Sequence, residues 1–363
     1  MKGKQGMVCM GLLLVLSSCH TGKQITASGL QRKDFQTEVN GQHTDLFTLS
    51  NKQGMEVCIT NYGARVVSIL VPDRNGKRED VVCGFSTITE YMEQRQNFGS
   101  TVGRYIGRIL NARFTLDGVE YKLVPNNGKS GHISHGGNPG FADRIWKVEQ
   151  ADTHRVRLSY LSPDGENGFP GNLKVTLVYS LGEDDNALDL TYEATTDAPT
   201  VLNLSHHSFF NISGNFTKSV EDQQLWVDAD RFTPYDDKKC VTGEYLQVAG
   251  TPLDFRMPHA IGECIDADHP QLKVVNGYDH TWELNTKGDD TRPAAWVYDP
   301  ASGRKMEIFT TEPGMQIYTG NGLKGKMTGK RGIAYPFRSA VCFETMHFQD
   351  SPNQPGFPST VLR

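Results

Sequence analysis

Apolar and polar residues alternate along much of the chain. In residues 155–160 and 188–193 every second residue is apolar, and Leu188, Leu190 and Tyr192 show the pattern clearly. Such a period of two predicts β-strands that bury one face and expose the other. No segment keeps a helical period over three or four turns between capping residues, so helices are expected to be few and short.

Two turns join alternating segments into predicted hairpins. Asp117-Gly118 lies within the alternating run of residues 113–123, and this dipeptide is typical of a two-residue hairpin turn. Residues 294–308 predict a second hairpin, with its turn at residues 299–303.

Turn-forming residues are spread along the whole chain. The 37 glycines and 17 prolines lie between apolar runs, and no repeat, low-complexity block or linker occurs from about residue 30 to the end. A chain of 363 residues is long enough for two ordinary domains or for one large β domain. The uninterrupted strand pattern favours an all-β fold, a large single-domain β-sandwich with few short helices.

The N-terminus differs in kind from the rest. Two lysines precede an apolar run of about ten residues, and Ser17 and Ser18 lead to Cys19. This pattern is typical of a secretory signal, and the run is roughly half as long as a membrane-spanning helix. Residues 16–19 resemble a bacterial lipobox, with plain cleavage as the alternative. We therefore predict a lipoprotein signal peptide at residues 1–18, lipidation of Cys19, a tether at residues 19–30 and a folded domain at residues 31–363. The protein would be exported and held on a bacterial membrane, in the periplasm or at the outer membrane, by its acyl chains alone.

Charge and cysteine content exclude several classes of function. The net charge is -5 and no basic stripe occurs, so a nucleic-acid partner is not expected. Beyond Cys19 five cysteines remain, an odd and widely spaced set that does not predict a disulfide framework. Cys58 and Cys342 lie in apolar runs, so we interpret them as small buried residues. The chain has no Gly-x-Ser-x-Gly or phosphate-loop motif.

Four segments combine titratable residues with glycines or apolar residues in ways that strand packing does not require. They are residues 103–108, 134–137, 203–211 and 340–345. Glycine permits close backbone approach, and Arg108 is suited to hydrogen-bond hydroxyl groups, although an exposed basic loop is the simpler interpretation. His135, beside two glycines, also fits a plain turn residue.

The last two segments carry the strongest candidates. His206 and His207 are adjacent, and neighbouring side chains of a strand point to opposite faces, so at most one of them serves a given site. Glu344 is a lone carboxylate among apolar residues, and it either faces solvent or is held for a function, because burial without partners is costly. Residues 277–280 and 312–321 pair polar groups with aromatic residues, which suits a pyranose ring.

Taken in order from about residue 30 to the end, these segments resemble the aldose 1-epimerase family. The resemblance is strongest at residues 344–353, which read Glu-Thr-Met-His-Phe-Gln-Asp-Ser-Pro-Asn, and at residues 356–360. It implies a galactose mutarotase-like β-supersandwich. It also implies the site residues: Glu344 as catalytic base, His207 as catalytic acid, and Arg108, His135, Asp279 and Gln316 as sugar-binding residues.

The implied reaction interconverts the α and β anomers of free aldohexoses such as galactose and glucose. One proton leaves the anomeric hydroxyl and another reaches the ring oxygen, so that the ring opens and recloses. A carboxylate and an imidazolium supply both transfers. The expected partner is one monosaccharide and the expected state is a monomer. No cofactor or metal is required for the chemistry, and a structural calcium on surface carboxylates is left open.

Three positions depart from the family's pattern. Many members have asparagine at the positions of Gly107 and His206, and glutamine at that of Met346, which should share a strand face with Glu344. These departures leave the catalytic acid and base intact, but they put the family's sugar preference in doubt for this chain.

Other functions fit some of the same residues. A non-catalytic sugar-binding module or sensor on this fold would need neither proton-transfer group. A glycoside hydrolase would need a second carboxylate, such as Asp279, opposite Glu344. An epimerase for sugar 6-phosphates would need more arginines around the site. The residue types of His135, His207 and Glu344 also suit zinc.

Overall fold

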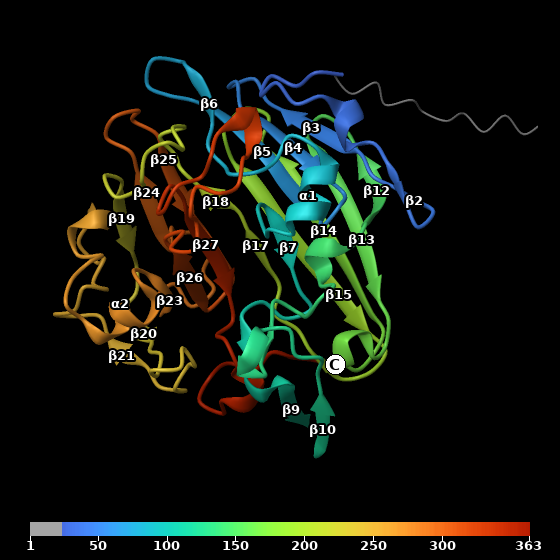
Figure 1. Cartoon of the computed structure of the whole chain (residues 1–363), viewed down its shortest axis with the longest axis vertical. Helices are drawn as coiled ribbons and strands as arrows, with labels where there is room; N and C mark the ends of the chain where they lie inside the picture. Colours follow the sequence, from blue (N-terminus) through green and yellow to red (C-terminus); the bar gives the residue numbers. More distant parts are fainter. Residues whose placement is uncertain (1–23) are drawn as a thin grey trace, which may run out of the picture.

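The computed structural model describes residues 24–363, so the predicted signal peptide and Cys19 lie outside the described residues. The described chain is built mainly from strands (Figure 1). Its two α-helices are short, α1 (Ile88–Gln94) and α2 (Pro270–Val275), as predicted. α1 begins at a capping box, in which Thr87 and Glu90 exchange side-chain and backbone hydrogen bonds. No helix in this part of the chain is long and apolar enough to cross a membrane.

One half of the molecule is a sandwich of two antiparallel four-stranded sheets, drawn in blue and green in Figure 1. The first sheet has the order β3 (Leu46–Ser50), β4 (Glu56–Thr60), β5 (Arg65–Pro72), β6 (Arg78–Asp80), and the second β12 (Lys147–Ala151), β13 (Arg155–Ser162), β14 (Leu173–Leu181), β15 (Leu188–Thr196). Val57, Leu158 and Leu177 belong to one buried cluster between the sheets. The apolar residues predicted from alternation on β13 and β15 face this cluster.

The other half packs a six-stranded sheet on a four-stranded one. The larger sheet has the order β18 (Phe209–Phe210), β27 (Val341–Met346), β26 (Gly314–Tyr318), β23 (Asp279–Glu283), β20 (Arg231–Thr233), β21 (Leu246–Gln247), and the smaller one β22 (His259–Ala260), β19 (Gln224–Val227), β24 (Ala295–Tyr298), β25 (Lys305–Ile308). Leu225 and Val297 of the smaller sheet share a core cluster with Trp282 and Ile317 of the larger one.

Short strand pairs complete the structure. They are β1 (Glu38–Val39) with β2 (Gln42–His43), β7 (Ser100–Val102) with β17 (Ser205–His207), β8 (Arg108–Ile109) with β11 (Ile133–Ser134), β9 (Arg113–Leu116) with β10 (Val119–Lys122), and β16 (Thr200–Val201) with β28 (Val361–Leu362). In Figure 1, β7 and β17 run between the two halves. Phe210 packs against the core clusters of both. The prediction of an all-β sandwich is confirmed.

Short 3-10 turns link many of these strands. In the described chain they are Arg32–Phe35, Leu110–Ala112, Gly128–Ser130, Phe141–Asp143, Glu166–Gly168, Ile261–Glu263, Lys330–Gly332 and Ser351–Asn353. Both predicted hairpins are present, because Leu116 pairs with Val119 across Asp117-Gly118 and β24 pairs with β25.

The N-terminal residues differ from the prediction at one boundary. Thr26 and Ser28, inside the segment expected to act as a tether, are 5% and 6% exposed. The backbone of Ser28 donates a hydrogen bond to the carboxylate of Glu56. Contacts with the folded domain therefore begin before residue 31.

The cysteines of the described chain are free, and Cys58 and Cys342 are buried as expected.

Candidate active site

One cavity gathers all six residues that the sequence assigns to the site. Its volume of about 250 Å³ suits a ligand smaller than a drug-sized molecule. The lining residues are Gln96, Asn97, Gly107, Arg108, Ser134, His135, His207, Phe209, Asp279, Gln316, Tyr318, Glu344, Met346 and Gln349. The cavity therefore brings segments from across the whole chain to one place.

Strand alternation places the acidic and amide groups on one face of the six-stranded sheet. Gln316 of β26 lies in register between Thr281 of β23 and Glu344 of β27. Asp279 precedes Thr281 by two residues and Met346 follows Glu344 by two, so both share this face. Met346 lines the cavity beside Glu344, as predicted.

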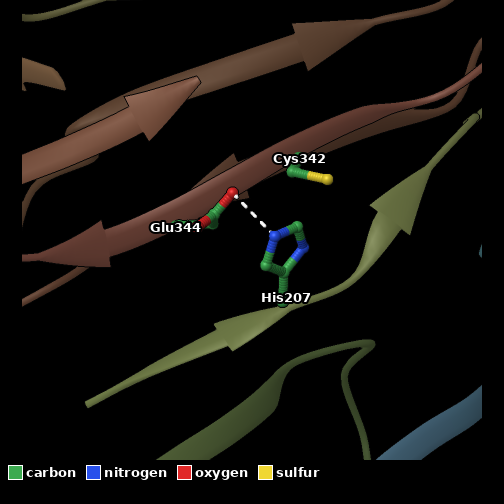
Figure 2. Close-up of side chains that lie close together, drawn as sticks. All are labelled: His207, Cys342 and Glu344. Carbon is green, nitrogen blue, oxygen red and sulfur yellow. Dashed lines mark ion pairs between the residues drawn. The ribbon is translucent and has the colours of Figure 1, made fainter. Parts of the chain in front are cut away.

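His207 enters the cavity from a different strand. It lies at the end of β17, opposite Ser100 of β7, and points toward Glu344 of β27 (Figure 2). The neighbouring His206 ring lies against Tyr179, with 6.2 Å between ring centroids, and does not line the cavity. One histidine of the adjacent pair therefore reaches the cavity, as the alternation argument predicts.

Glu344 and His207 form a close buried pair. The His207 Nε2 atom lies 3.4 Å from a carboxylate oxygen of Glu344, and the two side chains are 8% and 4% exposed (Figure 2). Burial, with a smaller effect of the nearby Asp279, raises the pKa of Glu344 well above its usual range. Burial also lowers the pKa of His207 well below its usual range. Both shifts disfavour charge, so over a wide pH range the pair holds a single proton, which either partner can carry.

Aromatic rings hold His207 in place. Phe209 stacks on its ring at 5.0 Å between centroids, and His135 meets it edge-on at 5.6 Å. The backbone N–H of Gly107 donates to His135 Nδ1 at 3.4 Å, so the proton of the neutral ring lies on Nε2. Burial and the nearby Arg108 lower the pKa of His135 to about 4. His135 is therefore a neutral hydrogen-bond donor at pH 7.

A chain of hydrogen bonds fixes the amide of Gln316. The Thr281 hydroxyl donates to Gln316 Oε1 at 2.5 Å, and Gln316 Nε2 donates to Asp279 Oδ1 at 2.6 Å. Burial raises the pKa of Asp279, while Arg108 and Gln316 oppose that shift. The second oxygen of the Asp279 carboxylate accepts none of these bonds, so it is available to a ligand hydroxyl.

One cluster at the site has the residue types of a metal centre. The ligand atoms of His207, Cys342 and Glu344 lie within 4.8 Å of one another (Figure 2). Burial and Glu344 raise the pKa of the Cys342 thiol well above its usual range. A cation bound by all three would therefore have to displace protons from both the thiol and the Glu344–His207 pair. The pair by itself already has what proton transfer needs, so the residues fit acid–base chemistry better than metal binding.

Several lining residues escaped the sequence analysis. Gln96 and Asn97 follow Arg95, the C-cap of α1, and belong to no recognisable motif. Tyr318 and Gln349 lie in two segments that carry predicted site residues. Gln349 follows β27 in irregular chain, where no period shows which side chains turn inward. A strand period would have identified Tyr318, which lies two residues after Gln316 on β26.

Comparison with known proteins agrees with this site. Residues 45–363 match the profile of the family described as Aldose 1-epimerase. The chain is 40% identical over 318 residues to galactose mutarotase of Bos taurus, covering 87% of this chain and 89% of that one. It is 36% identical over 320 residues to aldose 1-epimerase of Escherichia coli (strain K12), covering 88% and 90%. A solved aldose epimerase homologue from C. elegans aligns with a TM-score of 0.81 at 30% identity, over 88% of this chain and 94% of that one. The protein therefore belongs to the aldose 1-epimerase family of isomerases.

Proposed function

We propose that this protein interconverts the α and β anomers of free aldohexoses such as galactose and glucose, with Glu344 and His207 as the proton-transfer groups. The observation that carries the proposal is the 3.4 Å contact between a buried carboxylate and a buried imidazole in a cavity of about 250 Å³. Two groups that share one proton supply both the base and the acid that ring opening needs.

The reaction begins with Glu344 as a carboxylate and His207 as an imidazolium. Glu344 takes the proton of the anomeric hydroxyl while His207 gives a proton to the ring oxygen, so the bond from C1 to that oxygen breaks and C1 becomes an aldehyde. Both groups are then neutral, which is the state that burial favours. After rotation about the C1–C2 bond, the reverse transfers close the ring on the other face and restore both groups. No electrons are exchanged, so no cofactor is required.

The remaining predicted residues suit the sugar hydroxyls. Arg108 is a charged donor, His135 is a neutral donor, and Asp279 is an acceptor. Gln316, fixed between Thr281 and Asp279, keeps the acceptor at a constant position. Preformed donors and acceptors of this kind reduce the ordering cost of binding a ligand.

Polarimetry tests the proposed reaction. Freshly dissolved α-galactose and α-glucose should relax to their equilibrium rotation faster with the enzyme, and Glu344→Gln should remove the acceleration. Glu312→Gln is a matched control, because Glu312 pairs with His347 and does not line the cavity. A parent enzyme that binds galactose without accelerating its relaxation would instead support a non-catalytic sugar-binding module.

We also propose that the protein is an exported lipoprotein anchored through Cys19. The support is the sequence of residues 1–19 alone, with its lysines, its apolar run and the lipobox-like residues 16–19. Membrane fractionation with mass spectrometry of the N-terminal peptide tests it, because acyl chains on Cys19 add a large, defined mass. Cys19→Ala should move the protein to the soluble fraction, and an unmodified Cys19 in the parent would contradict the proposal. The monomeric state stays a prediction, which light scattering of the enzyme tests.

A further inference from the structure

Gln349 places a buried amide on the cavity wall beside the sugar-binding residues. Its side chain lines the cavity, and the residue is 5% exposed. The Nε2 atom donates to the Tyr235 hydroxyl at 2.7 Å and to Gln316 Oε1 at 3.4 Å. The Oε1 atom accepts from the backbone N–H of Arg108 at 3.3 Å. The amide therefore bridges the segments that carry Arg108 and Gln316.

The backbone around Gln349 is fixed to the same wall. The N–H of Asp350 donates to the Arg108 carbonyl at 2.8 Å, and the Asp350 carboxylate accepts from the Leu110 N–H at 2.9 Å. The residue after Gln349 is thus hydrogen-bonded to Arg108 and Leu110, in the segment that also donates to the Gln349 amide. Gln349 has little freedom to leave the wall.

Gly107 provides the space that Gln349 occupies. A Cβ atom added at Gly107 would lie 2.6 Å from Gln349 Cγ, which is far too close, and 3.2 Å from its Cδ, which is a tight contact. Gly107 also has a φ of +76°, a conformation that glycine adopts without strain. A side chain at position 107 and the observed Gln349 side chain therefore exclude each other. Because residue 107 has no side chain, the Gln349 side chain fills this part of the cavity wall and presents its amide there.

We infer that Gln349 is a specificity-determining residue, whose amide binds one hydroxyl of the sugar in the space left by Gly107. This inference rests on the proposed function of the site. A glutamine amide offers two donor hydrogens and two acceptor lone pairs, and the protein bonds engage both Nε2 hydrogens and one lone pair of Oε1. One acceptor lone pair of Oε1 is left for a hydroxyl group of the ligand, which would donate to it. Gln349 makes no hydrogen bond with Glu344 or His207, so its contribution belongs to binding rather than to proton transfer.

Kinetics with galactose, glucose and singly deoxygenated galactoses test the inference. Gln349→Met keeps the length of the side chain and removes the amide, so KM for galactose should rise about 3-fold to 10-fold, the value of one hydrogen bond, with kcat within about twofold of the parent. For the deoxygalactose that lacks the hydroxyl bound by Gln349, parent and variant should have equal KM values. Should Gln349→Met fail to fold, Gln349→Leu also removes the carbonyl acceptor and should give the same rise.

Two glycine variants separate the contact from backbone strain. Gly107→Ala should displace the Gln349 amide and raise the KM for galactose as Gln349→Met does. Gly118 is the matched control: its φ is +79°, and an added Cβ meets nothing within 4 Å, so Gly118→Ala imposes similar strain without touching the site. It should leave KM unchanged.

The outcomes distinguish this inference from the proposed function. A KM that rises by one common factor for every sugar would give Gln349 a purely structural role and overturn the inference. An active parent whose KM is unchanged by Gln349→Met would do the same. A parent that accelerates none of the sugars would overturn the proposed function, and this inference with it.

Discussion

Burial of two side chains sets the chemistry at the scale of single residues. It raises the pKa of Glu344 and lowers that of His207, so it widens the pH range in which the pair holds one shared proton. Gaining a second proton requires His207 to become charged beside a neutral carboxyl. Losing the shared proton requires Glu344 to ionise beside a neutral imidazole. We therefore expect kcat/KM to show a plateau between an acid limb and an alkaline limb.

Asp279 should add to the effect of burial on the position of the alkaline limb. Its carboxylate raises the pKa of Glu344, because two negative charges close together repel. Asp279→Asn removes this charge, so the pKa of Glu344 should fall and the alkaline limb of kcat/KM should move to lower pH. Polarimetry from pH 5 to pH 10 measures the position of the limb independently of any loss in overall activity. A limb that stays in place, or moves to higher pH, would contradict this electrostatic role.

At the scale of elements, the sequence predicts which face of a strand a side chain occupies, but it does not predict which strands pair with each other. A period of two correctly separates His206 from His207 and places Met346 beside Glu344. The Asp117-Gly118 turn correctly gives the hairpin of β9 and β10. The pairing of Ser100 with His207 depends on contacts between distant segments, which no local pattern records. The inward turn of Gln349, in an irregular segment after β27, depends on the same kind of contact.

A buried ion pair connects the loop at Lys330 to the end of β6. Lys330 Nζ lies 2.5 Å from both the Asp80 carboxylate and the Val67 carbonyl, and the two charged side chains are 7% and 9% exposed. Lys330→Met would leave the Asp80 carboxylate buried without its cation, which costs about 3–5 kcal/mol of unfolding free energy. Urea denaturation measures this loss.

An exposed lysine supplies the control for that variant. Lys305 pairs with Glu307 at 2.7 Å, and their side chains are 45% and 44% exposed, so Lys305→Met should cost less than about 1 kcal/mol. Equal losses for Lys330→Met and Lys305→Met would show that burial of the Lys330–Asp80 pair does not matter.

At the scale of the whole molecule, two packed sandwiches meet at the active site. The all-β class was predictable, because strand periodicity, scattered turn residues and the lack of a linker all agree. The order β18-β27-β26-β23-β20-β21 was not, because strands from four separate parts of the chain enter one sheet. Contacts of the N-terminal segment with the domain also begin earlier than the sequence predicts. Thr26 and Ser28 are polar, so their burial against the domain leaves no hydrophobic signal in the sequence.

Buried neutral histidines should make the folded state sensitive to acid. Burial lowers the pKa of His280 to about 3, whereas an unfolded chain binds this proton near pH 6.5. The contribution of His280 to stability is therefore complete above about pH 6.5 and is lost as pH falls toward 3. Between pH 7 and pH 5 this single group should cost about 2 kcal/mol of unfolding free energy.

Urea denaturation at pH 7 and at pH 5 measures that loss. His280→Phe should reduce it by about 2 kcal/mol, because the variant has no imidazole to protonate on unfolding. His43→Phe should leave the loss unchanged, since the His43 side chain is 80% exposed. If His280→Phe is as sensitive to acid as the parent, His280 is not a neutral buried group.

The most direct test of the shared-proton pair is a double-variant cycle read by polarimetry with galactose. Glu344→Gln and His207→Asn should each lower kcat/KM by at least about 100-fold, the usual contribution of a general acid or base. Because the two groups exchange one proton, the double variant should be no slower than the slower single variant. Losses that multiply in the double variant would mean that Glu344 and His207 act independently, and would contradict the mechanism.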